Sequence, residues 1–423
     1  MLLVYGALVM GGIETFFVRL IKSRYETGLK TKILLTQPEV FSQPELLNEV
    51  KKYGEVIFIQ QLFSVPSAVL KVLPKAFFPL LPVKRQLVSS LFDEVSQIHV
   101  SDGFSGIVAC VLAEKVNRQL PITVGFYHSK EFLWGANRAL PYFEKVNRNF
   151  VFNELNQANL IIFNEALILL YKKHERDLSS ANCFPIGVVD VIARNEKLVQ
   201  SSGKNKTLKI VSVGRLVDFK TYNKWMIELV ASLKNAAFSI EYHIYGNGPL
   251  EASLRKLAKQ LGLEDTIHFH GLLNYADFDT TVAQYDVFVG SGTAIVQAAA
   301  LGVPSIIGIE NVPEPYSYGY IADIAGFSYN EDGLYEKVSV ASLLHNFNAM
   351  SDSDKASLKL KHIEKAKTFS MANCITNFTR VEQSAKAIDL RRLPKFRYCA
   401  SLLLNVVLAK LMKNHPLRFK YVD

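Results

Sequence analysis

Short apolar runs alternate with segments of helical spacing along the first part of the chain. Apolar runs predict strands at residues 2–8, 32–35, 56–60, 97–100, 121–127 and 159–163. Between the first two runs, apolar residues recur at helical spacing over residues 13–21. Strands that alternate with helices form parallel sheets. We therefore expect an α/β domain here.

The same alternation resumes later in the chain. Apolar runs predict strands at 208–213, 240–245, 267–269, 286–289 and 305–309, with helices between them. The polar stretch 189–206 contains Ser201, Ser202 and Gly203, which mark a linker. We place the domain boundary near residue 200 and expect domains at 1–200 and 201–385, followed by a basic amphipathic tail at 386–423.

Composition agrees with two globular α/β domains. The chain has 423 residues, of which 49% are hydrophobic and 21% charged, and this excludes a disordered or acidic tail protein. Its four cysteines are scattered without a CxxC pair, so we expect reduced thiols of a cytoplasmic protein rather than disulfides or metal ligands. They are Cys110, Cys183, Cys374 and Cys399.

The net charge of +9 is concentrated at one end. Residues 391–423 contain eight Lys or Arg and one acid, so this segment supplies seven of the nine charges. Residues 65–85 also combine apolar side chains with four cations and no acid. Such surfaces suit an anionic membrane. The alternative is that both segments pack on the first domain and their cations are merely solvated.

The lengths of the apolar runs argue against a membrane-spanning helix, and the few aromatic residues of the tail argue against a nucleic-acid partner. No apolar run reaches the ~20 residues that a membrane span needs, and residues 1–21 lack a basic leader and predict a strand, a glycine turn and a helix rather than a signal peptide. We expect a cytoplasmic protein, peripheral on the inner face of the plasma membrane. A nucleic-acid partner is not expected, because the tail offers few stacking aromatics, namely Phe396, Tyr398, Phe419 and Tyr421.

The stretch 208–220, LKIVSVGRLVDFK, carries the leading candidate chemistry. Its strand breaks at Gly214 into Arg215 and Lys220, so two cations follow a strand's carboxyl end. In open α/β sheets ligands bind at that end, and an arginine with a lysine can hold a diphosphate. The alternative is a strand followed by a solvated helix start.

Three glycine turns are candidates for contact with an anionic ligand. Gly11 and Gly12 follow the first strand, and Gly246 lies in a turn before a helix. A third turn joins a strand to a helix and offers backbone N–H groups and hydroxyls for a phosphate or sugar. It consists of Gly290, Ser291, Gly292 and Thr293. Each could instead be a tight turn or a plain helix cap.

Isolated histidines and acidic residues are the remaining candidates for a functional site. His128 follows the strand 121–127 and could contact substrate or stabilise a leaving phosphate, although most lone histidines are structural. His268 and His270 alternate along a strand without a third ligand, so we interpret them as sheet residues. Asp277 and Asp279 mimic a metal-binding DxD in a surface helix. We therefore expect no metal.

Five motifs occur in an order that resembles family 4 glycosyltransferases of the GT-B fold. They are GGIE (11–14), VSVGRLVDFK (211–220), YGNGPLEASL (245–254), IHFHG (267–271) and YDVFVGSGTAIVQAAALGVPSI (285–306). The resemblance implies two Rossmann-like parallel-sheet α/β domains facing a cleft. Residues 1–200 would form the acceptor side, and residues 201–385 would bind a nucleotide sugar.

The resemblance also implies residue roles. Arg215 and Lys220 would bind the donor diphosphate, and the turn at Gly11 and Gly12 would approach it from the other side. His128 resembles the family's cleft histidine. The turn 290–293 matches the segment that meets the donor's sugar and phosphates, and Gly246, in the motif at 245–254, would also bind the donor.

The chain departs from the family pattern EGFGxxxxE, because Val289 and Gln297 stand where the two glutamates are usual. In the family the second glutamate accepts hydrogen bonds from the ribose, which Gln297 can do more weakly through its amide oxygen. Val289 cannot replace the first. Either sugar recognition has moved to neighbours such as Ser291 and Thr293, or activity is reduced or lost.

The function implied is retaining, metal-independent transfer of a sugar from a nucleotide-sugar donor to a lipid-linked or surface glycan. The donor would be a substrate, and no cofactor is expected. The alternatives are a catalytically silent GT-B partner or glycan-binding subunit, and a sugar-nucleotide epimerase that needs no acceptor.

Overall fold

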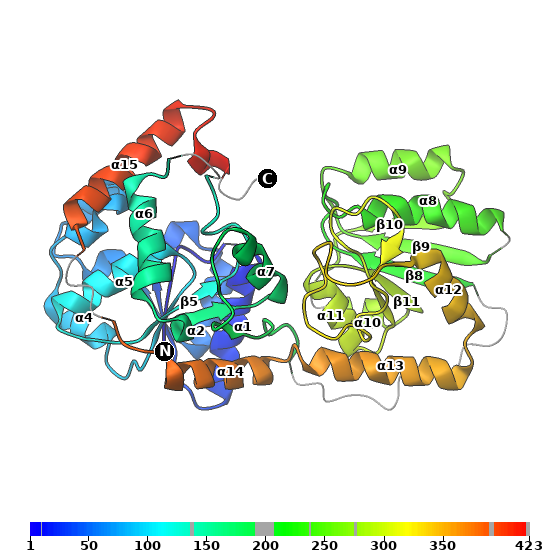
Figure 1. Cartoon of the computed structure of the whole chain (residues 1–423), viewed down its shortest axis with the longest axis horizontal. Helices are drawn as coiled ribbons and strands as arrows, with labels where there is room; N and C mark the ends of the chain where they lie inside the picture. Colours follow the sequence, from blue (N-terminus) through cyan, green and yellow to red (C-terminus); the bar gives the residue numbers. More distant parts are fainter. Residues whose placement is uncertain are drawn as a thin grey trace. The chain divides into compact units, whose positions relative to one another are not determined.

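The computed structural model consists of two compact units, which are described separately (Figure 1). It describes residues 1–9, 11–135, 139–190, 207–236, 238–274, 277–388 and 393–419. Unit 1 contains Met1–Ile186 and Cys374–Asp423, and unit 2 contains Gly187–Asn373. The boundary expected near residue 200 lies outside the described residues. The chain returns to unit 1 at Cys374, inside helix α14, and not at residue 386.

Unit 1 is built on a parallel sheet, as the sequence predicts. Within the described residues the strand order is β3-β2-β1-β4-β5-β6-β7. Strands β4, β5 and β6 are buried along their whole length, as apolar strands covered on both faces should be. The strands are β1 (Leu2–Tyr5), β2 (Lys32–Leu35), β3 (Glu55–Phe58), β4 (Ile98–Val100), β5 (Ile122–Phe126), β6 (Leu160–Ile162) and β7 (Asn182–Cys183).

Helices follow most of these strands. Helix α5, after β4, begins where the Asp102 carboxylate accepts a hydrogen bond from the Ser105 N–H at 2.9 Å. The helices of unit 1 are α1 (Gly12–Glu26), α2 (Pro44–Tyr53), α3 (Ser67–Val72), α4 (Arg85–Leu91), α5 (Gly103–Lys115), α6 (Tyr142–Asn149), α7 (Glu165–Lys173), α14 (Met371–Ser384) and α15 (Lys395–Leu411). Shorter helical turns are η1 (Glu39–Phe41), η2 (Ile59–Leu62), η3 (Lys75–Leu80), η4 (Phe150–Glu154), η5 (Gln157–Asn159) and η8 (Pro416–Phe419).

The basic tail packs on unit 1 through α15, which lies against α6 and η3 (Figure 1). The Tyr398 hydroxyl donates to Asn147 Oδ1 at 2.9 Å, and the Lys395 ammonium lies 2.6 Å from the Glu114 carboxylate. The outer side of α15 nevertheless carries exposed apolar side chains, namely Phe396, Leu404, Val407, Leu411 and Met412. Of the tail's cations, Arg391, Arg392 and Lys420 lie outside the described residues. In the described part of the chain, no helix is both long and apolar enough to cross a bilayer.

Unit 2 contains a second parallel sheet, again as predicted, so the expectation of two parallel-sheet α/β domains is confirmed. In the described residues its strand order is β10-β9-β8-β11-β12. The strands are β8 (Leu208–Val213), β9 (Ile240–Tyr245), β10 (Ile267–Gly271), β11 (Val287–Gly290) and β12 (Ser305–Ile307), with a small antiparallel pair of β13 (Tyr316–Ser317) and β14 (Val338–Ser339).

Helices cover unit 2's sheet from both sides, with α8 and α9 on one side and α10 and α11 on the other (Figure 1). The helices are α8 (Tyr222–Asn235), α9 (Glu251–Gln260), α10 (Phe278–Val282), α11 (Thr293–Ala300), α12 (Val340–Ala349) and α13 (Asp352–Lys367). Trp225 and Met226 of α8 pack in one core cluster with Tyr242 of β9. Strand β9 alternates strictly, and its opposite face carries only half-buried polar side chains at Glu241 and His243.

A buried histidine makes unit 1 sensitive to acid. His99 of β4 is fully buried, with Nδ1 3.0 Å from Thr123 Oγ1 and Nε2 2.7 Å from the Tyr127 hydroxyl. The Thr123 hydroxyl also accepts from Gln97 Nε2 at 2.7 Å and lies 3.3 Å from the Ile98 carbonyl, so the ring is enclosed by neutral groups. These partners suit the neutral ring, and burial lowers the pKa of His99 to about 3.

We predict that His99 makes the free energy of unfolding fall in mild acid. Its folded pKa lies below the unfolded value of about 6.5, so the unfolded chain binds the proton first and stability is lost as the pH falls. Between pH 7 and pH 5 the loss from this group is about 2 kcal/mol. Urea unfolding of wild type and His99→Gln at both pH values measures it. The stability difference between the two proteins should shrink by that amount at pH 5, and an unchanged difference would contradict the assignment.

Candidate functional site

The two predicted cations lie in the turn between β8 and α8, at the carboxyl end of a central strand of unit 2. Arg215 is exposed and Lys220 is half-buried. The Lys220 side chain folds back over the end of β8. Its Nζ lies so close to Gly214 that a methyl group added to this glycine would be only 2.8 Å away. Arg215 and Lys220 both belong to the turn that follows β8, at the edge of the sheet where open α/β domains bind ligands.

The Gly246 turn fixes the backbone beside Arg215. The Gly214 N–H donates to the Tyr245 carbonyl and the Leu216 N–H to the Asn247 carbonyl, both at 2.9 Å. A Cβ on Gly246, whose φ is +143°, would overlap the Gly214 carbonyl group. The Gly246 N–H itself donates to the Gly271 carbonyl at 2.6 Å. Gly246 thus positions the turn that carries Arg215, and its N–H is already bonded within the protein.

The turn 290–293 joins β11 to α11 at the same edge of the sheet. Gly292 has a φ of +67°, its N–H donates to Asn330 Oδ1 at 3.0 Å, and its carbonyl accepts from the Tyr329 hydroxyl at 3.0 Å. Gly292 has open space where a side chain would stand, and Thr293 is exposed as the first residue of α11. This helix start is therefore open to a ligand at Gly292 and Thr293.

Ser291 is buried and points to a carboxyl group that sequence reasoning missed. Its hydroxyl donates to Glu310 Oε1 at 2.8 Å. Burial raises the pKa of the Glu310 carboxyl, while the hydrogen bond from Ser291 and the positive charges of Lys220 and Arg215 act in the opposite direction. Unit 2 thus gathers two cations, a serine and a glutamate at one place. Glu310 belongs to no motif, and only the fold brings it there.

The two positions that differ from the family pattern have different surroundings. Val289 is fully buried in the core of unit 2, and its carbonyl accepts from the Ser212 hydroxyl at 2.6 Å. Gln297 is half-buried on α11, one helical turn after Thr293 and on the same side of the helix. Val289 is therefore a core residue, whereas Gln297 lies along the open side of the turn 290–293.

The remaining candidates belong to unit 1. His128 lies two residues after β5, and its Nδ1 accepts from the Lys130 N–H at 3.2 Å, which places the proton of the neutral ring on Nε2. Gly11 and Gly12 begin α1, and Gly12 has open space in place of a side chain. The Glu14 carboxylate lies against Gly11 and accepts from the Tyr5 hydroxyl at 2.8 Å. Both turns lie at the carboxyl edge of unit 1's sheet.

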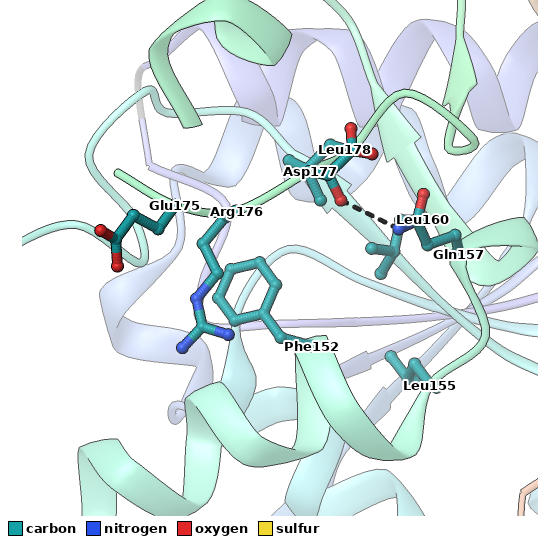
Figure 2. A pocket seen from close by; sticks show the side chains of 8 residues that line it. All are labelled: Phe152, Leu155, Gln157, Leu160, Glu175, Arg176, Asp177 and Leu178. Atoms are coloured by element: carbon teal, nitrogen blue, oxygen red, sulfur yellow. Dashed lines mark hydrogen bonds between the residues drawn. The ribbon is translucent and has the colours of Figure 1, made fainter. Parts of the chain in front are cut away.

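Two other features stand apart from these residues. Asp277 and Asp279 are exposed at the start of α10, in the surface helix that the sequence predicts. Figure 2 shows a small open pocket of unit 1, in which Gln157 Nε2 donates to the Asp177 carbonyl at 2.9 Å. None of its eight lining residues is an expected site residue. They are Phe152, Leu155, Gln157, Leu160, Glu175, Arg176, Asp177 and Leu178.

Comparison with known families identifies the segment that holds the cations. Residues 194–314 match the family model described as "Glycosyl transferases group 1". This segment contains Arg215, Lys220, Gly246, the turn 290–293 and Glu310.

Two curated relatives match parts of the chain. The GtfA subunit of the UDP-N-acetylglucosamine–peptide N-acetylglucosaminyltransferase of Streptococcus pneumoniae is 22% identical over 245 residues, which are 55% of this chain and 46% of the relative. WcaL of Escherichia coli, a glycosyltransferase ascribed to colanic acid biosynthesis, is 30% identical over 120 residues, which are 25% of this chain and 29% of the relative. The chain thus matches less than half the length of these relatives.

Solved structures match over nearly the whole chain. A glycosyltransferase from Rickettsia africae has a TM-score of 0.60 at 13% identity and covers 90% of this chain and 97% of its own. Anabaena HepE in complex with UDP and glucose has a TM-score of 0.56 at 15% identity and covers 91% and 100%. The chain therefore has the GT-B fold, as the sequence predicts, and its residues 194–314 are similar to the glycosyl transferases group 1 family.

Proposed function

We propose that this protein is a glycosyltransferase that moves a sugar from a nucleotide-sugar donor to a glycan acceptor. The observation that carries the proposal is the grouping of Arg215 and Lys220 with Ser291 and Glu310 at the carboxyl edge of unit 2's sheet. Such an edge is where nucleotides bind in α/β folds. The family match over residues 194–314 supports the reaction class, and the UDP and glucose bound to HepE support the donor class.

Arg215 and Lys220 would supply the charge stabilisation. As the bond between the sugar and the diphosphate breaks, negative charge grows on the departing phosphate oxygens. A guanidinium and an ammonium fixed at that point stabilise this charge more than that of the intact donor, which lowers the barrier. The acceptor hydroxyl would attack from the face that the diphosphate leaves, so that the configuration is retained. Two fixed cations make a metal ion unnecessary in this scheme.

Donor-sugar recognition would depend on Glu310 in place of the usual first glutamate. Val289 is buried in the core, so it cannot reach a ligand. Glu310 is held by Ser291 beside the turn 290–293 and can accept hydrogen bonds from sugar hydroxyls. The amide oxygen of Gln297, on the open side of α11, would accept a hydrogen bond from the ribose.

The acceptor would be a lipid-linked or surface glycan, met at the inner face of the plasma membrane. The support is a surface of unit 1 where α15 adjoins η3. It exposes Leu404 and Leu411 of α15, Met412 just after this helix, and Leu80 of η3. Lysines also occur in and beside these segments. Apolar side chains flanked by cations suit the surface of an anionic membrane.

A catalytically silent subunit is the second candidate. It is favoured by the burial of Val289, which removes one glutamate of the family pattern from the site. One of the similar solved structures, at a TM-score of 0.58, is a GtfA/B complex, which shows that this fold also occurs in subunits of an assembly. The experiments below distinguish this candidate from an enzyme.

We predict that Arg215→Ala and Lys220→Ala each reduce sugar transfer by about 100-fold or more, because each removes one charge that stabilises the leaving diphosphate. Turnover of a panel of nucleotide sugars in the presence of membrane extract measures the effect. Lys224→Ala is the matched control, since this exposed lysine of α8 pairs with Glu228 across one helical turn and is not among the proposed site residues. If the wild type shows no turnover and Arg215→Ala is harmless in cells, the silent subunit is the better account.

We predict that Glu310→Gln separates sugar recognition from diphosphate binding. The amide oxygen can still accept from Ser291, so the local fold should persist. Loss of a charged acceptor for sugar hydroxyls should lower kcat/KM by about 10-fold or more. Affinity for the free nucleoside diphosphate should stay the same or rise, because an acid near two cations is removed. An equal loss for the nucleotide and the sugar nucleotide would mean that Glu310 only positions the cations.

Transfer should also proceed without a divalent metal. We predict that EDTA leaves the initial rate unchanged at a temperature where the protein stays folded, because Arg215 and Lys220 supply the positive charge. The measurement is the transfer rate with EDTA, before and after addition of Mg²⁺ or Mn²⁺. A rate that EDTA abolishes and either ion restores would contradict this part of the scheme.

A further inference from the structure

The polar face of β9 and the edge strand β10 hold a cluster that the proposed reaction does not use. Glu241 and His243 project from β9, and His268 projects from β10. One ligand atom from each of these three side chains lies within 4.8 Å of the other two, and all three side chains are half-buried. They are thus close to one another and still accessible to an ion from solvent.

The sheet register brings these side chains together. His268 of β10 is the register partner of His243 of β9, and their rings are 4.7 Å apart between centroids. Glu241 precedes His243 by two residues and therefore projects from the same face. The opposite face of β9 packs in the core of unit 2, so the backbone that presents the cluster is rigid.

A fourth residue holds His243 in orientation. His243 Nδ1 lies 3.0 Å from His270 Nε2, and the two rings are stacked with an angle of 6° between their planes. The Tyr245 ring stacks in turn on His270 at 4.4 Å. Metal-binding histidines usually have their second ring nitrogen hydrogen-bonded, most often to a carboxylate, a backbone carbonyl or water, and here His270 takes that place. The other nitrogen, Nε2, then lies 3.4 Å from the Glu241 carboxylate.

We propose that Glu241, His243 and His268 bind a divalent transition-metal ion, with Zn²⁺ the best match. Two imidazoles and one carboxylate are a common donor set for Zn²⁺, with water in the fourth position. Around tetrahedral zinc the ligand atoms lie about 3.3 Å apart, so the three side chains must close in slightly. Lys209 Nζ lies 3.8 Å from the Glu241 carboxylate, and its side chain is exposed enough to move into solvent when an ion binds.

The ion would join the edge strand to the body of the sheet. Strand β10 is at the end of the strand order and pairs only with β9 among the described strands of its sheet. A metal bound by His268 and by two residues of β9 crosslinks this pair through side chains. Glu241 and His243 precede Tyr245 and Gly246 along β9, and His268 is the register partner of His243, so the ion lies along the strands and not among the groups that would hold the diphosphate.

Metal titration of the full chain tests the proposal. The chain is first stripped with a chelator and then titrated with Zn²⁺ by calorimetry and with Co²⁺ by visible absorption. We expect one equivalent of either ion to bind, Co²⁺ to give a tetrahedral spectrum, and Mg²⁺ not to compete. Zn²⁺ should also raise the melting temperature by several degrees, because it binds only the folded state.

Matched variants identify the ligands. Glu241→Gln and His268→Gln should each lower the Zn²⁺ affinity by about 100-fold or more. His345→Gln is the control, since His345 is an exposed histidine of α12 that packs on Phe238 and is not a member of the cluster. Without metal, both variants should have the melting temperature of the metal-free wild type. If one variant does not fold, the other still tests whether these side chains bind the ion.

Two results would overturn the proposal. One is the absence of saturable Zn²⁺ binding by the wild type. The other is an equal loss of affinity in His268→Gln and His345→Gln, which would show only adventitious binding to surface histidines. Because these readouts involve no sugar transfer, they stand or fall independently of the proposed enzymatic activity.

Discussion

Two backbone turns meet without a side chain between them at the carboxyl edge of unit 2's sheet. Gly246 lies directly against the Gly214 carbonyl, and hydrogen bonds from Gly214 and Leu216 join the two turns. This contact determines where β8 ends, and hence where Arg215 and Lys220 stand. Any larger residue at 246 would force the turns apart. The candidate site therefore depends on a close backbone approach more than on any one side chain.

The electrostatics of the site follow from that placement. A carboxyl group as buried as that of Glu310 is costly to ionise by itself, and its raised pKa reflects this cost. The nearby cations and the Ser291 hydroxyl reduce the cost, while an ionised Glu310 offsets one of the two positive charges before any ligand binds. An anionic diphosphate and a hydroxyl-rich sugar would each find a complementary partner there. Charge and hydrogen bonding are thus divided between residues far apart in the sequence.

Much of the fold could be predicted from the sequence, because apolar runs and glycine turns are local signals. The strands at 208–213 and 240–245 have the predicted bounds, and both predicted parallel sheets are present. Glu310 could not be predicted as a neighbour of Ser291, since no local pattern encodes contacts across a sheet. The same holds for the neighbours of His268. It was interpreted as a sheet residue without a third ligand, and it does lie in β10, but Glu241 and His243 come from the adjacent strand, which no local pattern indicates. The return of the chain to unit 1 inside α14 likewise has no glycine- or proline-rich signal.

The central claim is that unit 2 binds a nucleotide sugar through Arg215 and Lys220. The most direct measurement is the melting temperature of the full chain in the presence of a panel of uridine, guanosine, cytidine and thymidine diphosphate sugars. We predict that one nucleotide class raises the melting temperature and that Arg215→Ala abolishes the rise, because a ligand bound only by the folded state stabilises it. If none of the panel shifts the melting temperature of the wild type, the donor site is assigned incorrectly.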